Sequence, residues 1–309
     1  AIALFLLKAD LIKVFTEGGR VLIAFLAGMA GTIAGAALAA LIVDLGVNEA
    51  RIAGVFAATY TGGSLNFVAV AEAVGLQDSS QLSAALAIDN IFGVGFILLL
   101  NLAAGWSLFQ RWYGWRADWL GERLLPVEDA DAGGASLFGL LSALAVSAAA
   151  VAVSGAVSTA LGIANYEMLV LTVIVTVLAT LGRSVLAGLK GEDVLAMMFM
   201  YLFFAIIGAG ADLGEMLQAA PGMFVMVGCI FVVHALAVLA VGRLLKLNYA
   251  EMVTASLACI AGPPIAAAIA ILFKWRNLVA PGILTGILGY VLGNFAGVGL
   301  FTLLQGGAP

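Results

Sequence analysis

The sequence predicts an all-α, polytopic membrane protein in which two inverted repeats each contain a broken or re-entrant helix. Of its 309 residues, 64% are hydrophobic and 10% are charged, whereas a soluble domain carries about 25% charged residues. The apolar residues gather in runs of about 20 residues, the length that a transmembrane helix needs. A third observation, the similarity of the two halves, predicts the repeats. Soluble and disordered proteins do not have this composition.

Uninterrupted apolar runs predict membrane-spanning helices along the whole chain. The opening segment Ala1–Leu7 is too short to span a membrane and is expected to be the end of a helix. The predicted spans that follow are Arg20–Val43, Leu82–Ala104, Ser136–Ile163, Met168–Gly182, Val194–Ala211, Gly222–Leu245 and Leu278–Leu304.

Two further apolar runs, Ile52–Leu76 and Met252–Phe273, are interrupted at their centres. The first contains the Gly-rich segment Thr61–Asn66, and the second contains Gly262–Pro264. Glycines and paired prolines break a helix, and the freed backbone groups must then be covered by protein or line a cavity. Each run is therefore predicted to be a broken or re-entrant helix.

A different kind of segment lies between Trp106 and Arg123. Three tryptophans recur there at helical spacing and alternate with arginines, which predicts an interfacial amphipathic helix with its indoles at headgroup level. A plain surface linker that ends in the acidic stretch Glu128–Asp131 is the alternative. The chain is thereby divided into a first repeat (1–104), a linker (105–134) and a second repeat (135–309).

The charge and cysteine content excludes other classes. The 13 basic and 18 acidic residues give a net charge of −5, but five of the acidic residues lie together in the linker, and nothing indicates nucleic-acid binding. Cys229 and Cys259 lie in apolar runs without the spacing of metal ligands, so they are interpreted as packing residues. No cofactor is predicted other than a coupling Na⁺.

The two halves of the chain resemble each other in the order of their elements. The aligned pairs are Ala9–Leu11 with Ala211–Leu213, the span from Arg20 with the span from Gly222, Gly62 with Gly262, and Asp89 with Thr285. Internal repeats with broken helices in matching positions are typical of secondary transporters, whose binding site lies at the breaks. The same comparison predicts that the first repeat lacks about two helices before Ala1.

The distribution of basic residues favours inverted repeats. If both broken segments are hairpins, all of the 13 basic residues except Arg51 lie on one side of the membrane, as the positive-inside rule expects. If both segments cross completely, the repeats are parallel and the basic residues are divided between the two sides. Inverted repeats are therefore preferred, and complete crossing is the alternative.

Asp89 is the one charged residue in the otherwise uncharged run Ser83–Leu100. A carboxylate at that depth costs about 2.5 kcal/mol or more and should face a cavity, a cation or a proton donor. Oxygen ligands near the first break suit Na⁺, and hairpin N-termini suit an anionic group. The alternative is that Asp89 only caps a hairpin. The predicted ion- and substrate-binding residues are Asp89, Asn90, Thr61, Gly62, Gly63, Ser64, Asn66, Gly262, Pro263, Pro264 and Thr285, with Asp89 and Asn90 as Na⁺ ligands.

Three other polar residues lie in apolar runs. Glu72 is either a second coupling carboxylate or a residue near the membrane interface. His234, which aligns with Thr32, is either a proton relay or a neutral histidine bonded to a neighbouring helix. Asn294 interrupts a stripe of glycines between Gly282 and Gly297, a small-residue face that favours close helix contact.

Two other functional classes explain less of the sequence. Gly62–Ser64 together with His234 fits an intramembrane serine protease, but such an enzyme does not need the repeat, and no enzymatic activity is predicted. A channel or a passive accessory subunit does not explain two symmetric breaks followed by an acidic helix. Both classes are therefore weaker hypotheses than a transporter.

The segment Thr59–Glu72, followed by Ala87–Asn90, resembles the bacterial and plastid family called domain of unknown function 819. Ala9–Leu11 and Gly262–Pro264 fit that family too, and the resemblance covers essentially the whole chain. The family is similar to the cation/proton antiporters and to the bile-acid/sodium and glutamate/sodium symporters. This kinship implies inverted repeats, an elevator-type transport domain beside a scaffold, a homodimer, and Na⁺ or H⁺ coupling. The order Asp89-Asn90 departs from the antiporters, which place two acids or Asn-Asp there.

The expected function is ion-coupled secondary transport of a small organic anion across a bacterial inner membrane, by a multi-pass protein. The expected partners are the lipid bilayer, the organic anion, Na⁺ or H⁺, and a second copy of the chain. A monovalent cation/proton antiporter is the alternative.

Overall fold

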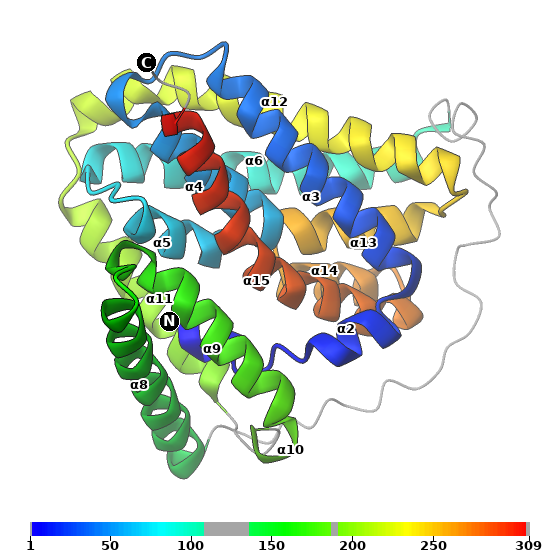
Figure 1. Cartoon of the computed structure of the whole chain (residues 1–309). Helices are drawn as coiled ribbons and strands as arrows, with labels where there is room; N and C mark the ends of the chain where they lie inside the picture. Colours follow the sequence, from blue (N-terminus) through cyan, green and yellow to red (C-terminus); the bar gives the residue numbers. More distant parts are fainter. Residues whose placement is uncertain (1, 108–135, 187–190, 307–309) are drawn as a thin grey trace.

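The computed structural model of the chain describes residues 2–107, 136–186 and 191–306, and within these ranges every regular element is helical (Figure 1). Apart from its first residues, the predicted interfacial helix lies outside the described residues. The α-helices are α1 (Ile2–Leu6), α2 (Leu11–Glu17), α3 (Gly19–Ala40), α4 (Glu49–Gly62), α5 (Ser64–Ala73), α6 (Ser79–Gly105), α8 (Leu137–Ala160), α9 (Glu167–Leu181), α10 (Arg183–Leu186), α11 (Glu192–Ala209), α12 (Leu213–Leu244), α13 (Tyr249–Ile260), α14 (Pro263–Leu272) and α15 (Arg276–Gly306). Short 3₁₀ turns, η1 (Gly46–Asn48) and η3 (Ala164–Tyr166), precede α4 and α9.

The prediction of an all-α, multi-pass membrane protein is confirmed. Five described helices, α3, α6, α8, α12 and α15, are long and apolar enough to cross a membrane. The predicted spans Met168–Gly182 and Val194–Ala211 form the shorter apolar helices α9 and α11. The repeated Ala-Asp-Leu motif begins a helix in both halves, because Asp10 caps α2 and Asp212 caps α12 through backbone N–H groups of the first turn.

Helices α3 and α12 cross each other in the larger body of the molecule, which also contains α4, α5, α6, α13, α14 and α15 (Figure 1). Glycines make this crossing close: a Cβ on Gly31 would lie 2.7 Å from the Cβ of Ala237, and one on Gly35 would lie 2.8 Å from the Cα of Ile230. The contacts run in opposite directions along the two helices, so α3 and α12 are antiparallel. Small residues permit this approach without loss of packing.

Both broken segments fold back on themselves as hairpins. Arg51 at the start of α4 donates from Nε to the carbonyl of Val74, just after α5, at 3.0 Å. At the other hairpin, the rings of Tyr249 at the start of α13 and Trp275, just after α14, lie edge to face with centroids 6.3 Å apart. The alternative in which these segments cross completely is therefore wrong.

The two hairpins start from opposite ends of the molecule. Arg20, in the first turn of α3, bonds the loop that leads into α13, whereas Gly222, in the early part of α12, contacts Leu45 beside the start of α4. Because α3 and α12 are antiparallel and each hairpin follows its own helix, the repeats are inverted, as predicted.

A smaller body consists of α1, α8, α9 and α11, which pack together beside the hairpins (Figure 1). An ion pair between Lys8 and Glu192 and a bond from the Thr180 hydroxyl to the carbonyl of Ala9 (3.0 Å) hold α1 there. Helix α1 belongs to the first repeat and its partners belong to the second. The spatial bodies therefore do not follow the division of the sequence.

Candidate functional site at the hairpin tips

The tips of the two hairpins meet in the middle of the larger body. Gly63 (φ 97°, ψ 176°) and Gly262 (φ 83°, ψ 177°) adopt the same backbone conformation, which is essentially restricted to glycine. A Cβ on Gly63 would lie 3.1 Å from the Cα of Gly262, so the prediction that the tips meet is confirmed. The alignment of Gly62 with Gly262 is one residue out of register, because Gly63 is the residue with the matching conformation.

The glycine stripe of α15 packs against the tips and along α4. A Cβ on Gly286 would lie 2.8 Å from the backbone N of Pro263, and one on Gly289 would lie 2.5 Å from the carbonyl oxygen of Thr61. These positions therefore exclude any side chain. The close helix contact that the stripe predicts is confirmed, and it brings α15 directly behind both breaks.

Asp89 projects from α6 to the first residue of α5. The Ser64 hydroxyl donates to Asp89 Oδ2 at 2.9 Å, and the carboxylate is buried, with 7% of the residue exposed. A carboxylate is favourable at a helix N-terminus, where backbone N–H groups have no helical partner. The N-cap residue Gly63 has no side chain with which to cap α5. Within the described residues, Asp89 has no ion-pair partner, so its charge is uncompensated unless a cation binds.

Tyr60, in the last turn of α4, is a site residue for which sequence reasoning assigned no role. It is fully buried, and its hydroxyl lies close enough to interact with Asp89, yet it makes no hydrogen bond among the described residues. Its ring stacks on Phe56 (centroids 5.8 Å apart) and meets the edge of Phe231 (4.8 Å). The sequence does place a tyrosine directly before the Gly-rich break. Because a buried tyrosine hydroxyl normally has a hydrogen-bond partner, this position could have indicated a site residue.

Asn66 and Thr61 lie at the tips, but their polar groups are used for structure. Asn66 Nδ2 donates to the carbonyls of Ala58 (3.2 Å) and Gly289 (2.9 Å), which ties the first hairpin to α15. The Thr61 hydroxyl donates to the carbonyl of Ala57 at 2.7 Å, within its own helix. The oxygen lone pairs of Asn66 and Thr61, and the backbone carbonyls of the break, are the groups that could still bind a cation or accept a hydrogen bond.

The side chains of the other predicted residues are exposed or form hydrogen bonds elsewhere. Asn90 is exposed and bonds the carbonyl of Leu86 in its own helix (2.9 Å), because one residue along a helix turns the side chain about 100° away from Asp89. Glu72 is exposed near the end of α5, away from the tip. The hydroxyl of Thr285 donates to the carbonyl of Pro281 at 2.8 Å. Asn294 donates from Nδ2 to Thr172 Oγ1 at 3.0 Å and joins α15 to α9.

His234 lies at the crossing of α3 and α12, fully buried. Its Nδ1 contacts Thr32 Oγ1 and the carbonyl of Gly28, both at 3.0 Å, and its Nε2 contacts Ser256 Oγ at 3.1 Å. Nδ1–H donating to the Gly28 carbonyl, with Nε2 accepting from Ser256, satisfies a neutral ring. This geometry favours the hypothesis of a structural histidine. The aligned pair Thr32 and His234 also touch, which places them on the pseudo-twofold axis.

The tips hold fewer oxygen donors for a cation than the sequence predicts, because Asn90 bonds within its own helix. Asp89 supplies a carboxylate, Ser64 and Tyr60 supply hydroxyl oxygens, and the break supplies backbone carbonyls, whereas Asn90 contributes nothing. Among the described residues there is no cluster of three or more acidic, histidine or cysteine ligands. The chemistry that remains is binding of a proton or of a monovalent cation by hard oxygen donors.

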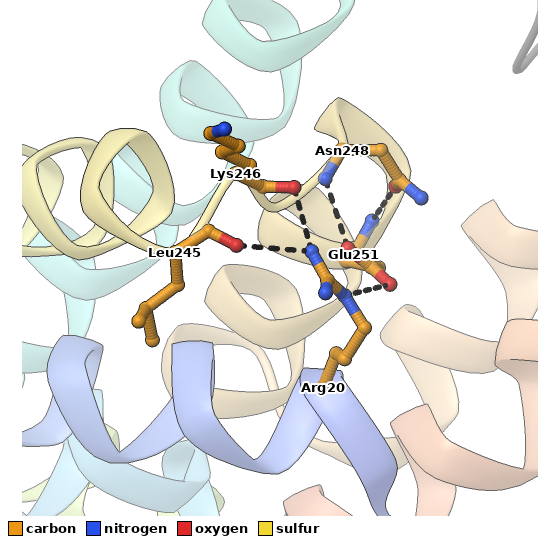
Figure 2. A network of polar contacts seen from close by, with 5 residues as sticks. All are labelled: Arg20, Leu245, Lys246, Asn248 and Glu251. Carbon is orange, nitrogen blue, oxygen red and sulfur yellow. Dashed lines mark hydrogen bonds and ion pairs between the residues drawn. The ribbon is translucent and has the colours of Figure 1, made fainter.

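An ion pair between Arg20 and Glu251 joins the base of the second hairpin to α3 (Figure 2). Arg20 Nε donates to Glu251 Oε1 at 2.9 Å, and its Nη2 donates to the carbonyls of Leu245 (3.3 Å) and Lys246 (2.6 Å). Glu251 also completes a capping box with Asn248. The network therefore fixes the start of α13, the helix that leads to the tip of the second hairpin.

Comparison with known proteins identifies the family of this chain. The chain is 30% identical, over 96% of its length and 79% of the relative's, to the uncharacterized membrane protein YjcL of Bacillus subtilis (strain 168). No solved structure matches the chain. Residues 1–306 match the family described as "Protein of unknown function (DUF819)". The chain, an all-α membrane protein with inverted hairpin repeats, therefore belongs to the DUF819 family.

Proposed function

We propose that this protein is an ion-coupled secondary transporter in which Asp89 binds the coupling cation. The observation that carries the proposal is a buried carboxylate, without a basic partner among the described residues, at the place where two inverted hairpins meet. Broken helices that meet in this way are the binding sites of secondary transporters. A cation, Na⁺ or H⁺, neutralises Asp89 and offsets the cost of its burial.

The proposed cargo is a small organic anion. Once Asp89 is neutralised, the backbone N–H groups of Ser64 and Leu65, in the first turn of α5, face the tips as donors for an anionic group. Occupation by the cation thus becomes the condition for binding the anion, which couples the two fluxes. Without the cation, the carboxylate competes for the same donors and repels the solute.

A monovalent cation/proton antiporter is the second candidate, and one observation favours it. The first turn of α14 begins with Pro263 and Pro264, which have no N–H, so the second tip offers few donors to an anion. The charge at the tips is that of Asp89 alone among the described residues, and its sign selects cations.

The smaller body of α1, α8, α9 and α11 is proposed as the scaffold of an elevator-type transporter, with the hairpin body as the moving part. The bond between Asn294 and Thr172 would then lie at the sliding interface. A homodimer in a bacterial inner membrane, with the basic end of the molecule in the cytoplasm, belongs to the same proposal.

The experiment uses purified protein in proteoliposomes. A thermal-shift screen of organic acids, with and without Na⁺, first selects the solute. Uptake of the radiolabelled solute should then require an imposed Na⁺ or H⁺ gradient and should disappear in Asp89→Asn. Na⁺-driven proton flux without any organic solute would instead establish the antiporter. Solute flux that ignores both gradients would indicate a channel and contradict both candidates.

A further inference from the structure

The carbonyl of Tyr60 is one of the acceptors that the first break frees. Helix α4 ends at Gly62, and the carbonyls in the last turn of a helix have no donor within the helix. For Tyr60, two side chains from other helices take that place: Thr32 Oγ1 of α3 and Cys259 Sγ of α13 each donate to its carbonyl at 3.1 Å. All three residues are fully buried. Cys259 is thus a hydrogen-bond donor as well as the packing residue that the sequence predicts.

His234 determines which way the Thr32 hydroxyl points. Nδ1 of the ring lies 3.0 Å from the carbonyl of Gly28, which can only accept, so Nδ1 carries the proton. Thr32 Oγ1, also 3.0 Å from Nδ1, therefore accepts from the ring, and its own single proton goes to the Tyr60 carbonyl. Nε2 carries no proton in the neutral ring and accepts from Ser256 Oγ at 3.1 Å.

These contacts connect the second hairpin to the first. Ser256 and Cys259 lie one turn apart on α13. Cys259 reaches the Tyr60 carbonyl directly. Ser256 reaches the same carbonyl through His234 and Thr32. Because each of these buried groups has a partner, a displacement of the last turn of α4 would leave polar groups unpaired, so the network fixes one position of that turn.

Tyr60 also carries the hydroxyl that lies beside Asp89. Its ring meets the edge of Phe231, and Phe231 in turn meets Phe96, with ring centroids 4.8 Å and 5.1 Å apart. The hydrogen bonds hold the backbone of Tyr60, and the aromatic contacts hold its ring. Both together therefore determine where the hydroxyl lies relative to the carboxylate.

We propose that Thr32 and His234 are positioning residues for the cation site. By fixing the Tyr60 carbonyl, they set where the Tyr60 hydroxyl lies relative to Asp89. Both residues act on the ion through Tyr60, whose carbonyl is where their hydrogen bonds end. The inference rests on the proposed function, because it takes Asp89 as the ligand of the coupling ion.

Ion-dependent thermal stabilisation of the detergent-purified full chain measures the site without a solute. The ion, Na⁺ or H⁺, is the one that stabilises the wild type and not Asp89→Asn. Thr32→Val removes the hydroxyl and keeps the shape, and it should raise the half-saturating ion concentration about five-fold, the loss of one hydrogen bond. Thr32→Ser keeps the hydroxyl and is the matched control, which should bind the ion as the wild type does. Thr32→Val is expected to fold, because Cys259 still donates to the Tyr60 carbonyl.

The double variant Thr32→Val/Tyr60→Phe distinguishes positioning from a general loosening of the fold. If Thr32 acts through the Tyr60 hydroxyl, the double variant should bind the ion as weakly as Tyr60→Phe alone, about five-fold below the wild type. Independent effects would multiply to about 25-fold and would overturn the proposal.

His234 offers a conservative pair of its own. His234→Asn retains an N–H donor close to the place of Nδ1 and should keep most of the ion affinity, whereas His234→Leu should lose about as much as Thr32→Val. Equal affinity of these two variants would overturn the positioning role of His234. Unchanged ion affinity in Thr32→Val would overturn the inference and leave Asp89 as the cation ligand. Absence of any stabilisation that depends on Asp89 would instead overturn the cation site of the proposed function, and this inference with it.

Discussion

At the scale of single residues, the site depends on one carboxylate and two hydroxyls. Asp89 accepts from Ser64 at 2.9 Å and lies beside the hydroxyl of Tyr60, which makes no hydrogen bond to the described residues. These groups come from α6, α5 and α4, so the site exists only when the first hairpin is folded against α6. The same position of Asp89 would serve as a cap for α5 or as a cation ligand. Only a variant that removes the charge of Asp89 can distinguish these two roles.

Asp89→Asn makes that change while keeping the shape of the side chain. We expect gradient-driven transport to disappear and the melting temperature to stay the same or rise, because an uncompensated buried charge is removed. Transport assays and thermal unfolding check both outcomes. Asn90→Ala is the matched control on the neighbouring exposed residue and should transport normally. Normal Na⁺ and pH dependence in Asp89→Asn would make Asp89 a structural cap.

Tyr60→Phe removes one hydroxyl and leaves the ring stacked on Phe56. We expect the KM for the coupling ion to rise about five-fold, the loss of one hydrogen bond of about 1 kcal/mol, with unchanged stability. The variant unfolds no more easily because the hydroxyl has no partner among the described residues in the absence of ligand. An unchanged KM would remove Tyr60 from the site.

At the scale of elements, hydropathy and helix breakers predict most of the fold. Apolar runs predict the long helices, and Gly262–Pro264 and the Gly-rich segment predict the breaks, because the chemistry of a break is local. Side-chain directions are not local. The order Asp89-Asn90 does not predict that the first side chain points inward and the second outward. The match of Gly63 with Gly262 depends on a backbone torsion angle, which the sequence does not give. Tyr60 is part of the site only because α6 lies beside it.

The tip glycines give a prediction at this scale. Gly63→Ala and Gly262→Ala should each destabilise the protein by about 1–3 kcal/mol, because an L-residue is strained at these angles, and transport should fall in parallel. Thermal or urea unfolding in detergent measures the cost. Gly299→Ala, in α15 with open space around it, is the control and should be neutral or slightly stabilising. Equal stability of all three variants would show that the tips are not as tightly held as described.

At the scale of the whole molecule, the inverted repeat determines which surfaces share a side of the membrane. The hairpin α4–α5 opens at the end that carries Arg51, and the hairpin α13–α14 opens at the end that carries Arg20, Lys246 and Lys274. The two hairpins therefore enter the body from opposite ends, which is the arrangement that the proposed transporter would need for alternating access.

Cysteine labelling tests this topology in a variant whose Cys229 and Cys259 are replaced by alanine. Val47→Cys, which is 91% exposed before α4, should react with an impermeant maleimide from outside the cell only. Lys274→Cys, just after α14, should react only after the membrane is opened. Labelling of both positions from the same side would contradict inverted repeats.

The contact between Thr32 and His234 has a consequence for the symmetry of the chain. A residue on a twofold axis meets its own counterpart, so two identical halves would place threonine against threonine or histidine against histidine. The pair seen here, in contact at 3.0 Å, takes a different residue from each half. The two halves are therefore not interchangeable, even at the point where their symmetry brings them together: one carries the carboxylate helix α6 and the other the glycine stripe of α15.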